Sequence, residues 1–126
     1  MQFHIDASSP VPLYAQLERT IRAAIAAGHL REGDRLPTVR HLAVELRINA
    51  NTVARVYAEL ERAGILTTQR GVGTSVRDPA AIAKPARERE RSLRTLADRL
   101  LADAAAIGIS LPEVIRHLQE RSKETR

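Results

Sequence analysis

One segment of this sequence, residues 49–62, gathers side chains that can bind a polyanion on one side of a predicted helix. At about 100° per residue, Asn51, Arg55 and Arg62 fall on the same side, and Thr52 lies on its flank. A guanidinium offers a rigid fork of N–H donors that fits phosphate or a guanine edge, and an amide both donates and accepts hydrogen bonds. We therefore expect this side of the helix to contact base edges or phosphates.

The other side of the same segment is apolar, which predicts that the helix packs against a core. Its apolar residues recur at the i, i+3, i+4 and i+7 spacing of one helical face: Val53, Val56, Tyr57 and Leu60. Asn49 is a suitable N-cap, and Gly64 is a suitable stop after the last turn. Packing of this face leaves the polar side exposed.

A shorter helix is predicted immediately before this one, and a hairpin after it. Thr38 can cap the shorter helix, whose apolar face comprises Val39, Leu42, Ala43 and Leu46. A turn through residues 47–48 separates the two helices. After Gly64, residues 65–68 favour a strand, residues 71–73 permit a sharp reversal, and residues 74–76 return. This order predicts a winged helix-turn-helix, an architecture that reads DNA.

The N-terminal region predicts one more helix for the same domain. Residues 1–11 are expected to form an extended lead-in, and Pro12 suits the first turn of a helix that Gly28 ends. Apolar residues recur in it every four positions: Leu13, Leu17, Ile21 and Ile25. A short strand is expected at residues 35–36. We assign residues 1–77 to the winged helix-turn-helix domain.

The composition shifts after residue 77, and a two-helix region is predicted beyond a linker at residues 78–85. A long helix from residue 86 to 107 carries an apolar seam with alternating steps of four and three: Leu93, Ala97, Leu100, Ala104 and Ile107. Ser110 and Glu113 form a capping box for a last helix, whose inward positions are Leu111, Val114, Ile115 and Leu118. The tail from Glu120 is expected to fray.

These two helices, at residues 86–126, predict an oligomer. One long helix and one short partner bury too little apolar surface to form a stable core alone, and the small Ala97 and Ala104 allow close approach of another helix. We therefore expect this region to be a dimerisation tail that a second copy of the chain completes. The expected fold is mainly α with a small β-hairpin.

Composition limits the class of partner and the compartment. The chain has 126 residues and a net charge of +5, from 20 Lys and Arg against 15 Asp and Glu, which suits a polyanion. One Phe, two Tyr and no Trp leave few rings to stack on single-stranded RNA. The absence of cysteine, of a long apolar stretch and of a signal peptide favours a cytoplasmic protein without a membrane partner, bound to the nucleoid when on DNA.

The sequence gives little support for a metal site, a dinucleotide site or a catalytic site. The four histidines, His4, His29, His41 and His117, lack the spacing of metal ligands. The run Gly71-Val72-Gly73 lacks the third glycine and the following helix of a dinucleotide site. No nucleophile, base and orienting acid stand together as a set. We expect neither an enzyme nor a cofactor.

Several motifs resemble those of the GntR family of bacterial transcription regulators, and in particular its small YtrA-like branch. The resemblance covers residues 10–77 and rests on Pro12-Leu13-Tyr14, Gly33-Asp34-Arg35-Leu36-Pro37, Arg40, Leu42-Ala43, Asn51-Thr52-Val53, Arg55, Tyr57, Glu59-Leu60-Glu61, Gly64 and Arg70-Gly71-Val72-Gly73-Thr74. Beyond residue 78 the resemblance is one of architecture, a winged helix followed by a short two-helix dimerisation tail. Two departures are His41, where the family commonly has Glu, and Ala50, where the branch often has Pro.

The resemblance implies a set of DNA contacts on three elements. By position these fall on Arg40, Asn49, Ala50, Asn51, Thr52, Arg55, Arg70 and Gly71. It also implies a homodimer that binds an inverted repeat in double-stranded DNA and represses transcription nearby, with no small-molecule effector assigned. Solvated arginines are the alternative for Arg40, Arg55 and Arg70, and local capping is the alternative for Asn51 and Thr52. The alternative function is a winged-helix module for protein interaction, and a ligand-binding or enzymatic domain with such a head is a third.

Overall fold

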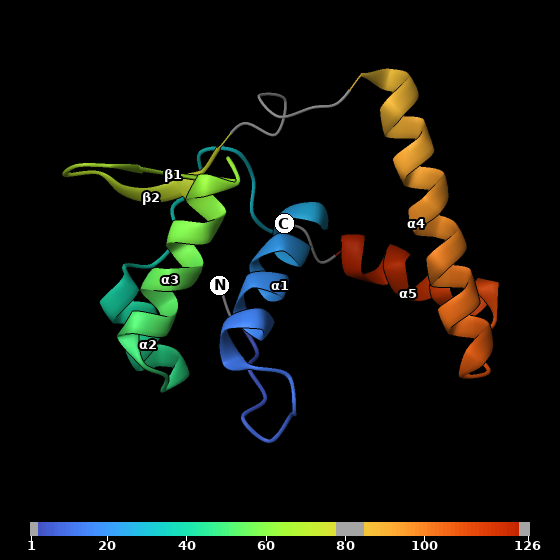
Figure 1. The fold of residues 1–126 in the computed structure, drawn as a ribbon, viewed down its shortest axis with the longest axis horizontal. Coiled ribbons are helices and arrows are strands. Elements are labelled where there is room, and N and C mark those ends of the chain that lie inside the picture. The colour runs from blue at the N-terminus through green and yellow to red at the C-terminus, as the bar shows by residue number, and fades with distance from the viewer. Residues whose placement is uncertain (1–2, 78–84, 124–126) are drawn as a thin grey trace. The chain divides into compact units, whose positions relative to one another are not determined.

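The computed structural model describes residues 3–77 and 85–123, and in this part it has five helices and one antiparallel hairpin (Figure 1). In chain order the elements are α1 (Leu13–Ala26), α2 (Val39–Leu46), α3 (Ala50–Arg62), β1 (Leu66–Gln69), β2 (Gly73–Val76), α4 (Ala86–Ala106) and α5 (Leu111–Lys123). The chain forms two compact units, Met1–Ala81 and Ile82–Arg126. The predicted mainly α fold with a small hairpin is confirmed.

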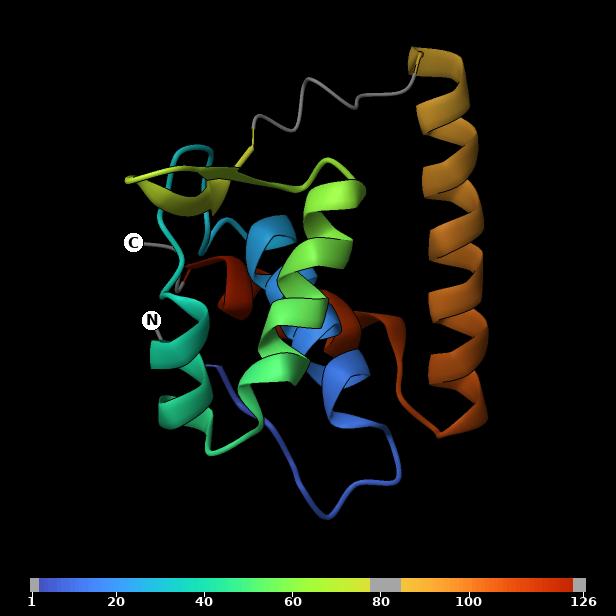
Figure 2. The ribbon, with the colours of Figure 1, turned by 60° about the vertical axis from the view of Figure 1, so that its left-hand side comes forward.

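The N-terminal unit is built around α3, which packs against α1, α2 and β1 (Figure 2). The four residues predicted to form its apolar face are all buried, and Val53 and Leu60 have no exposed surface. The other elements add the remaining core residues, which include Leu17, Ile21, Leu30, Leu36, Leu42, Ala43, Leu66 and Val76. Burial of this stripe is the main source of stability for the unit, because isolated helices of this length are marginal in water.

The predicted caps at the starts of α2 and α3 are both present. The Thr38 hydroxyl accepts a hydrogen bond from the backbone N–H of His41 at 3.1 Å. The Asn49 side chain accepts one from the N–H of Asn51 at 2.7 Å. Between the caps, Arg47 has a left-handed backbone with φ of 57°, which is uncommon for a residue other than glycine and makes the turn sharp. Local side-chain bonds therefore begin each helix, and the left-handed Arg47 ends the first.

The hairpin is tied to the segment that precedes α2. Its strands pair in register from Leu66 with Val76 to Gln69 with Gly73. Arg35 forms an isolated bridge with Ser75, and the N–H of Leu36 donates to the carbonyl of Thr74 at 2.9 Å. The strand expected at residues 35–36 is thus a single bridge that anchors the base of the hairpin.

The N-terminal lead-in belongs to the core, which the sequence analysis did not anticipate. Phe3 is 8% exposed and packs in the core cluster. The side chain of Gln16 fastens the loop that follows, because its amide accepts from the N–H of Asp6 at 2.8 Å and donates to the carbonyls of Asp6 and Val11 at 2.9 and 2.8 Å. A single aromatic residue in a polar segment has no periodicity, so only the tertiary structure reveals its partner.

The C-terminal unit consists of α4 packed against α5. The predicted capping box is present: the N–H of Ser110 donates to the Glu113 carboxylate at 2.8 Å, and the N–H of Glu113 donates to the Ser110 hydroxyl at 3.4 Å. The hydrogen bonds from the Ser110 N–H and hydroxyl lower the pKa of Glu113. The expectation of fraying from Glu120 was wrong, because α5 continues to Lys123. Of the linker predicted at residues 78–85, residues 78–84 lie outside the described part, and Pro85 is the N-cap of α4.

Tyr57 links α3 to the segment before α2 and provides a test of the core. Its hydroxyl donates to the carbonyl of Pro37 at 2.8 Å. Burial, followed by the negative charge of Glu45, raises the pKa of this hydroxyl, so it remains a donor. We expect Tyr57→Phe to lower the free energy of unfolding by about 1–2 kcal/mol, because a carbonyl loses its partner.

Urea denaturation measures this change, and Tyr14→Phe is the matched control. Tyr14 is 38% exposed, and no hydrogen bond to its hydroxyl is found among the described residues. The control is expected to change the free energy of unfolding by less than about 0.5 kcal/mol. Equal losses in the two variants would contradict a structural role for the bond to Pro37.

Candidate nucleic-acid interface

The first turn of α3 is an exposed polar surface at the N-terminal end of a helix. Asn49, Ala50 and Asn51 are exposed, and Thr52 is half-buried. The side chain of Asn49 serves as the cap, whereas the side-chain amide of Asn51 makes no hydrogen bond within the described residues. The N-terminus of a helix carries a partial positive charge and favours an anion such as phosphate. This turn can therefore bind a phosphate while Asn51 reaches a neighbouring group.

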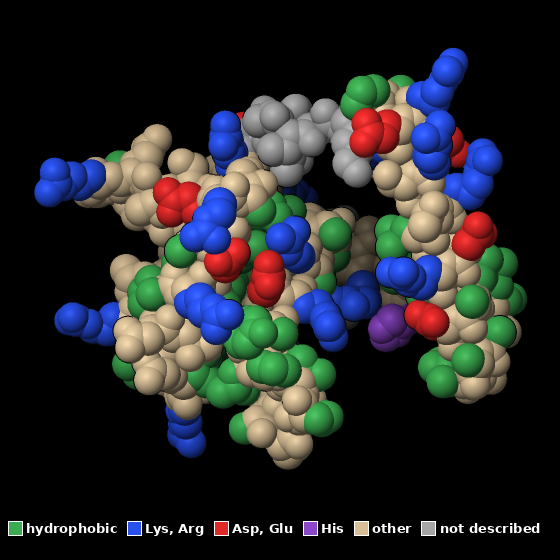
Figure 3. Space-filling model, in the orientation of Figure 1, with side chains coloured by type: hydrophobic (Ala, Val, Ile, Leu, Met, Phe, Trp, Pro, Cys, Tyr) green, Lys and Arg blue, Asp and Glu red, His purple; other side chains and the backbone are tan. Residues whose placement is uncertain are grey.

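Two further elements contribute exposed arginines. Arg40 lies near the start of α2 and is exposed, as is Arg70 between β1 and β2. In Figures 1 and 2 the end of the hairpin and α2 lie on the same side of α3. Figure 3 shows a basic side chain standing clear of the protein at the end of the hairpin. The structure thus brings arginines from separate segments to the side of the unit where the hairpin extends.

The conformation of the hairpin turn depends on glycine. Gly71 has φ of 80° and Gly73 has φ of 108°, both in the left-handed region that other residues avoid. No atom lies within 4 Å of where a Cβ would stand on either residue, so backbone conformation rather than crowding requires glycine here. A turn without side chains at these positions can approach another molecule closely, with Arg70 beside it.

The hairpin is also connected to the C-terminal part of α3. The Thr68 hydroxyl lies 3.3 Å from the carboxylate of Glu61 and 3.1 Å from the hydroxyl of Thr74. The N–H of Ile65 donates to the carbonyl of Leu60 at 2.9 Å. These bonds join α3 to both strands and hold the hairpin at a defined angle to the helix.

Helical spacing alone places Arg55 free on the outer side of α3, but in the structure it contacts α1. Its Cζ atom lies 4.2 Å from the centre of the Tyr14 ring, so the guanidinium stacks on a residue of α1. Tyr14 was recognised only as part of a family motif. Its contact with α3 could not be found by spacing, because α1 and α3 are brought together by packing of the core.

Arg62 shares the polar side of α3 with Arg55, but it is paired. Its guanidinium lies 2.7 Å from the carboxylate of Glu59, and Arg22 on α1 lies 3.3 Å from Glu18. Such exposed pairs contribute little to stability. Arg62 and the carboxylates of Glu18 and Glu59 are therefore each engaged in an ion pair, which distinguishes Arg62 from the unpaired Arg55.

The C-terminal unit exposes many apolar side chains among its charged ones. Its exposed large apolar residues are Leu93, Leu96, Leu100, Leu101, Ile107, Ile109, Leu111, Ile115 and Leu118. In the predicted seam, Ala104 differs from the others because it is only 7% exposed within this chain, and Val114 is half-buried. Those two residues lie where α4 packs on α5. The other residues predicted for the seam and for the last helix are exposed to another molecule.

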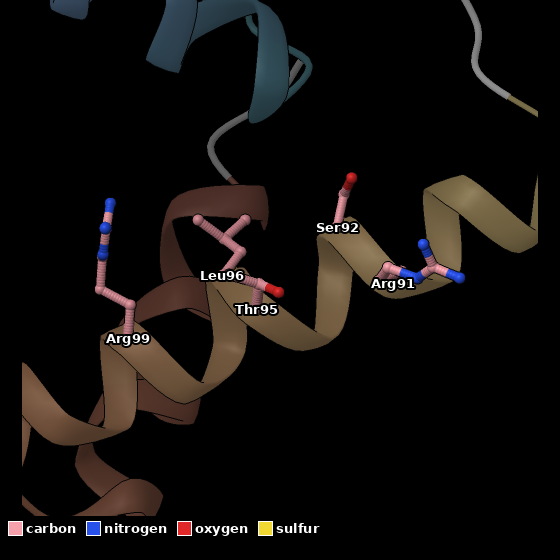
Figure 4. A pocket seen from close by; sticks show the side chains of 5 residues that line it. All are labelled: Arg91, Ser92, Thr95, Leu96 and Arg99. Atoms are coloured by element: carbon pink, nitrogen blue, oxygen red, sulfur yellow. The ribbon is translucent and has the colours of Figure 1, made fainter.

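A hollow of about 360 Å³ lies along α4 and is lined by Arg91, Ser92, Thr95, Leu96 and Arg99 (Figure 4). Because these described residues all belong to one helix, the hollow lacks the convergent walls of a ligand pocket. Within residues 3–77 and 85–123, no helix combines the length and apolarity that crossing a bilayer requires.

Comparison with known proteins places these features in a family. Residues 13–76 match the family described as bacterial regulatory proteins, gntR family. The chain is 32% identical over 122 residues to the HTH-type transcriptional repressor YtrA of Bacillus subtilis, covering 97% of this chain and 93% of YtrA. It is 37% identical over 116 residues to the HTH-type transcriptional regulator Rv1152 of Mycobacterium tuberculosis, covering 90% and 88% of the two chains. Both relatives are named as regulators of transcription, which agrees with the expectation of a regulator rather than an enzyme.

Solved structures give the same result for the fold. YtrA from Sulfolobus acidocaldarius, a GntR-family transcription factor, is 33% identical with a TM-score of 0.57, covering 79% of this chain and 97% of that one. A transcriptional antiterminator from Listeria monocytogenes is 26% identical with a TM-score of 0.68, covering 99% and 92%. The DNA-binding domain of AraR, solved in complex with operator ORE1, is 25% identical with a TM-score of 0.50, covering 60% and 93%. The family match and the identity to YtrA across almost the whole chain establish that this protein belongs to the GntR family of bacterial regulatory proteins.

Proposed function

We propose that this chain is a sequence-specific DNA-binding regulator of transcription that binds an inverted-repeat operator as a homodimer and represses nearby genes. The observation that carries the proposal is the exposed, polar first turn of α3, with α2 and the hairpin extending on the same side of that helix. The likeness to the operator-bound DNA-binding domain of AraR supports DNA as the ligand. The likeness to the repressor YtrA supports repression.

In this proposal α3 enters the major groove with its N-terminal turn leading. The major groove admits a helix and presents a distinct pattern of donors and acceptors for each base pair. Asn51 and Arg55 are the residues of α3 whose side chains match adenine and guanine edges, respectively. The residues proposed to contact DNA are Arg40, Asn49, Ala50, Asn51, Thr52, Arg55, Arg70 and Gly71. Ala50 and Gly71 contribute through close backbone approach rather than through a polar side chain.

The hairpin serves as the wing and places Arg70 against the minor groove beside each half-site. A narrow minor groove at A·T pairs has an enhanced negative potential and attracts arginine. The two positive-φ glycines leave room for the backbone to approach the sugar-phosphate wall. The hydrogen bond from Thr68 to Glu61 supports this role, because it ties the hairpin to the C-terminal part of α3.

The C-terminal unit is proposed to be the dimerisation region. Leu93, Ile107 and Leu118 are 58%, 72% and 50% exposed, and large exposed apolar surfaces are typical of protein–protein interfaces. A second copy offers the same apolar surface, and a two-fold pair buries both. The proposed contact residues are Leu93, Ala97, Leu100, Ala104, Ile107, Leu111, Val114, Ile115 and Leu118, with Ala104 and Val114 also packing within the chain.

Selection from a random duplex library with the full-length protein tests the proposed function. A regulator of this kind enriches a palindromic site, and its affinity for that site falls as salt rises, because bound phosphates release counterions. A competing duplex of scrambled sequence is the control. Failure to enrich any sequence, with no retention of duplex DNA at low salt, would instead favour a module for protein interaction.

Arg55→Ala tests the contribution of the unpaired arginine on α3. If Arg55 makes a bidentate base contact, the change weakens binding to the selected site by about 1–3 kcal/mol and leaves the fold intact. Fluorescence anisotropy at fixed salt measures the affinity. Arg62→Ala is the matched control, because Arg62 is on the same side of α3 but is paired with Glu59. An unchanged affinity for Arg55→Ala would remove this residue from the interface.

Arg70→Ala tests the wing. We expect a lower affinity and a weaker preference for A·T pairs flanking each half-site, since a narrow minor groove favours arginine. Binding is compared on duplexes that differ only in these flanks. A loss that is equal on all flanks would indicate a phosphate contact, and no loss would mean that the wing stays off the DNA.

Removal of residues 79–126 tests the dimer. The N-terminal unit has its own core, so the truncated chain is expected to fold as a monomer that retains every proposed DNA contact. Without linkage of two half-site contacts, affinity for the palindrome falls by at least about a hundredfold, whereas affinity for one half-site barely changes. Sedimentation of both proteins, with palindromes of altered spacing, checks this. A full-length protein that sediments as a monomer at micromolar concentration would contradict the proposal.

A further inference from the structure

Tyr14 and Arg55 form a contact between α1 and α3 on the surface of the N-terminal unit. The Arg55 Cζ atom lies 4.2 Å from the centre of the Tyr14 ring, well within the range of a cation–π interaction. Tyr14 is the second residue of α1, and Arg55 lies in the second turn of α3. Tyr14 is 38% exposed, so the stacked pair remains accessible to a ligand.

The surroundings of the pair contain two carboxylates, but neither pairs with Arg55. A crevice of about 210 Å³ is lined by Tyr14, Glu18, Arg55, Val56 and Glu59. Glu18 is paired with Arg22 at 3.3 Å, and Glu59 with Arg62 at 2.7 Å. Among the described residues, the Arg55 guanidinium makes no ion pair or hydrogen bond, and its contact is with the Tyr14 ring.

Stacking leaves the chemically useful part of the guanidinium free. The ring covers one face of the planar group, whereas the five N–H donors point outward in its plane. A long arginine side chain normally loses rotamer freedom when it binds, and this loss opposes binding. A side chain already ordered on a ring loses less. The contact therefore orders Arg55 without using the donors that a guanine edge or a phosphate needs.

We propose that Tyr14 is a positioning residue for DNA binding, and that its ring holds the Arg55 guanidinium in the orientation in which its N–H donors meet the DNA. This inference rests on the proposed function, in which Arg55 contacts DNA from α3. The ring face is the active part of Tyr14 in this role. Its hydroxyl is not required, which separates positioning from a direct phosphate contact by Tyr14.

The stacked pair is tested first in the protein without DNA. A hydrogen held over an aromatic face resonates upfield, so the Nε–H signal of Arg55 is expected upfield of the other arginine side-chain signals in the NMR spectrum of the full chain. The shift persists in Tyr14→Phe and disappears in Tyr14→Leu. Melting curves of both variants verify that the fold is retained. An Arg55 signal unaffected by Tyr14→Leu would overturn the proposal.

A double-mutant cycle then tests whether Tyr14 acts through Arg55. On the duplex selected with the wild-type chain, Tyr14→Leu is expected to weaken binding by about two- to fivefold, the range for an exposed cation–π pair, and Tyr14→Phe by less than that. In an Arg55→Ala background, Tyr14→Leu causes no further loss, because the residue through which it acts is absent. In an Arg70→Ala background, which alters a different element, the full effect of Tyr14→Leu remains.

The outcomes separate this inference from the proposed function. Additive losses from Tyr14→Leu and Arg55→Ala would overturn the positioning role while leaving DNA binding in place. A loss in Tyr14→Phe as large as in Tyr14→Leu would assign the effect to the hydroxyl and also overturn it. If the wild-type chain binds no duplex DNA, the proposed function fails and this inference fails with it, although the NMR result still reports on the pair.

Discussion

The structure of the N-terminal unit depends on one constraint, which is that α3 has a single apolar stripe and that three neighbouring elements cover it. Val53 and Leu60 lose all their exposed surface in this packing. A helix buried along one stripe must present its opposite side to solvent. The burial that stabilises the fold therefore also orients the polar side of α3, and no separate interaction is needed to expose Asn51.

The turn before α3 and the hairpin after it refine this arrangement through local bonds. Thr38 caps the start of α2 and Asn49 caps the start of α3, and the left-handed Arg47 at the end of α2 sharpens the turn between them. The bond from Thr68 to Glu61 connects the hairpin to the same helix, and the contact between the Thr68 and Thr74 hydroxyls joins its two strands. Each bond is worth about 1 kcal/mol or less, so they select a geometry more than they stabilise the unit.

The two units use apolar residues in opposite ways. In the N-terminal unit most large apolar residues lie inside, and Tyr14, Val44 and Val72 are the exposed exceptions among the described residues. In the C-terminal unit, Leu93, Ile107 and Leu118 are half or more exposed, and only Ala104 is buried among the described residues. A surface of that kind is stable in water when another apolar surface covers it. Most of the exposed large apolar residues that the structure describes therefore lie in the C-terminal unit.

The sequence by itself determined the elements of this protein, because their causes are local. Periodicity placed the helices, Thr38, Asn49 and Ser110 placed their starts, and glycines placed the hairpin turn. It also identified the exposed polar turn of α3. Only the tertiary structure decided which residues from distant segments meet: Phe3 in the core, Gln16 on the loop at Asp6, and Tyr14 beneath Arg55. Those contacts join positions far apart in the chain, and packing of whole helices, rather than any local spacing, creates them.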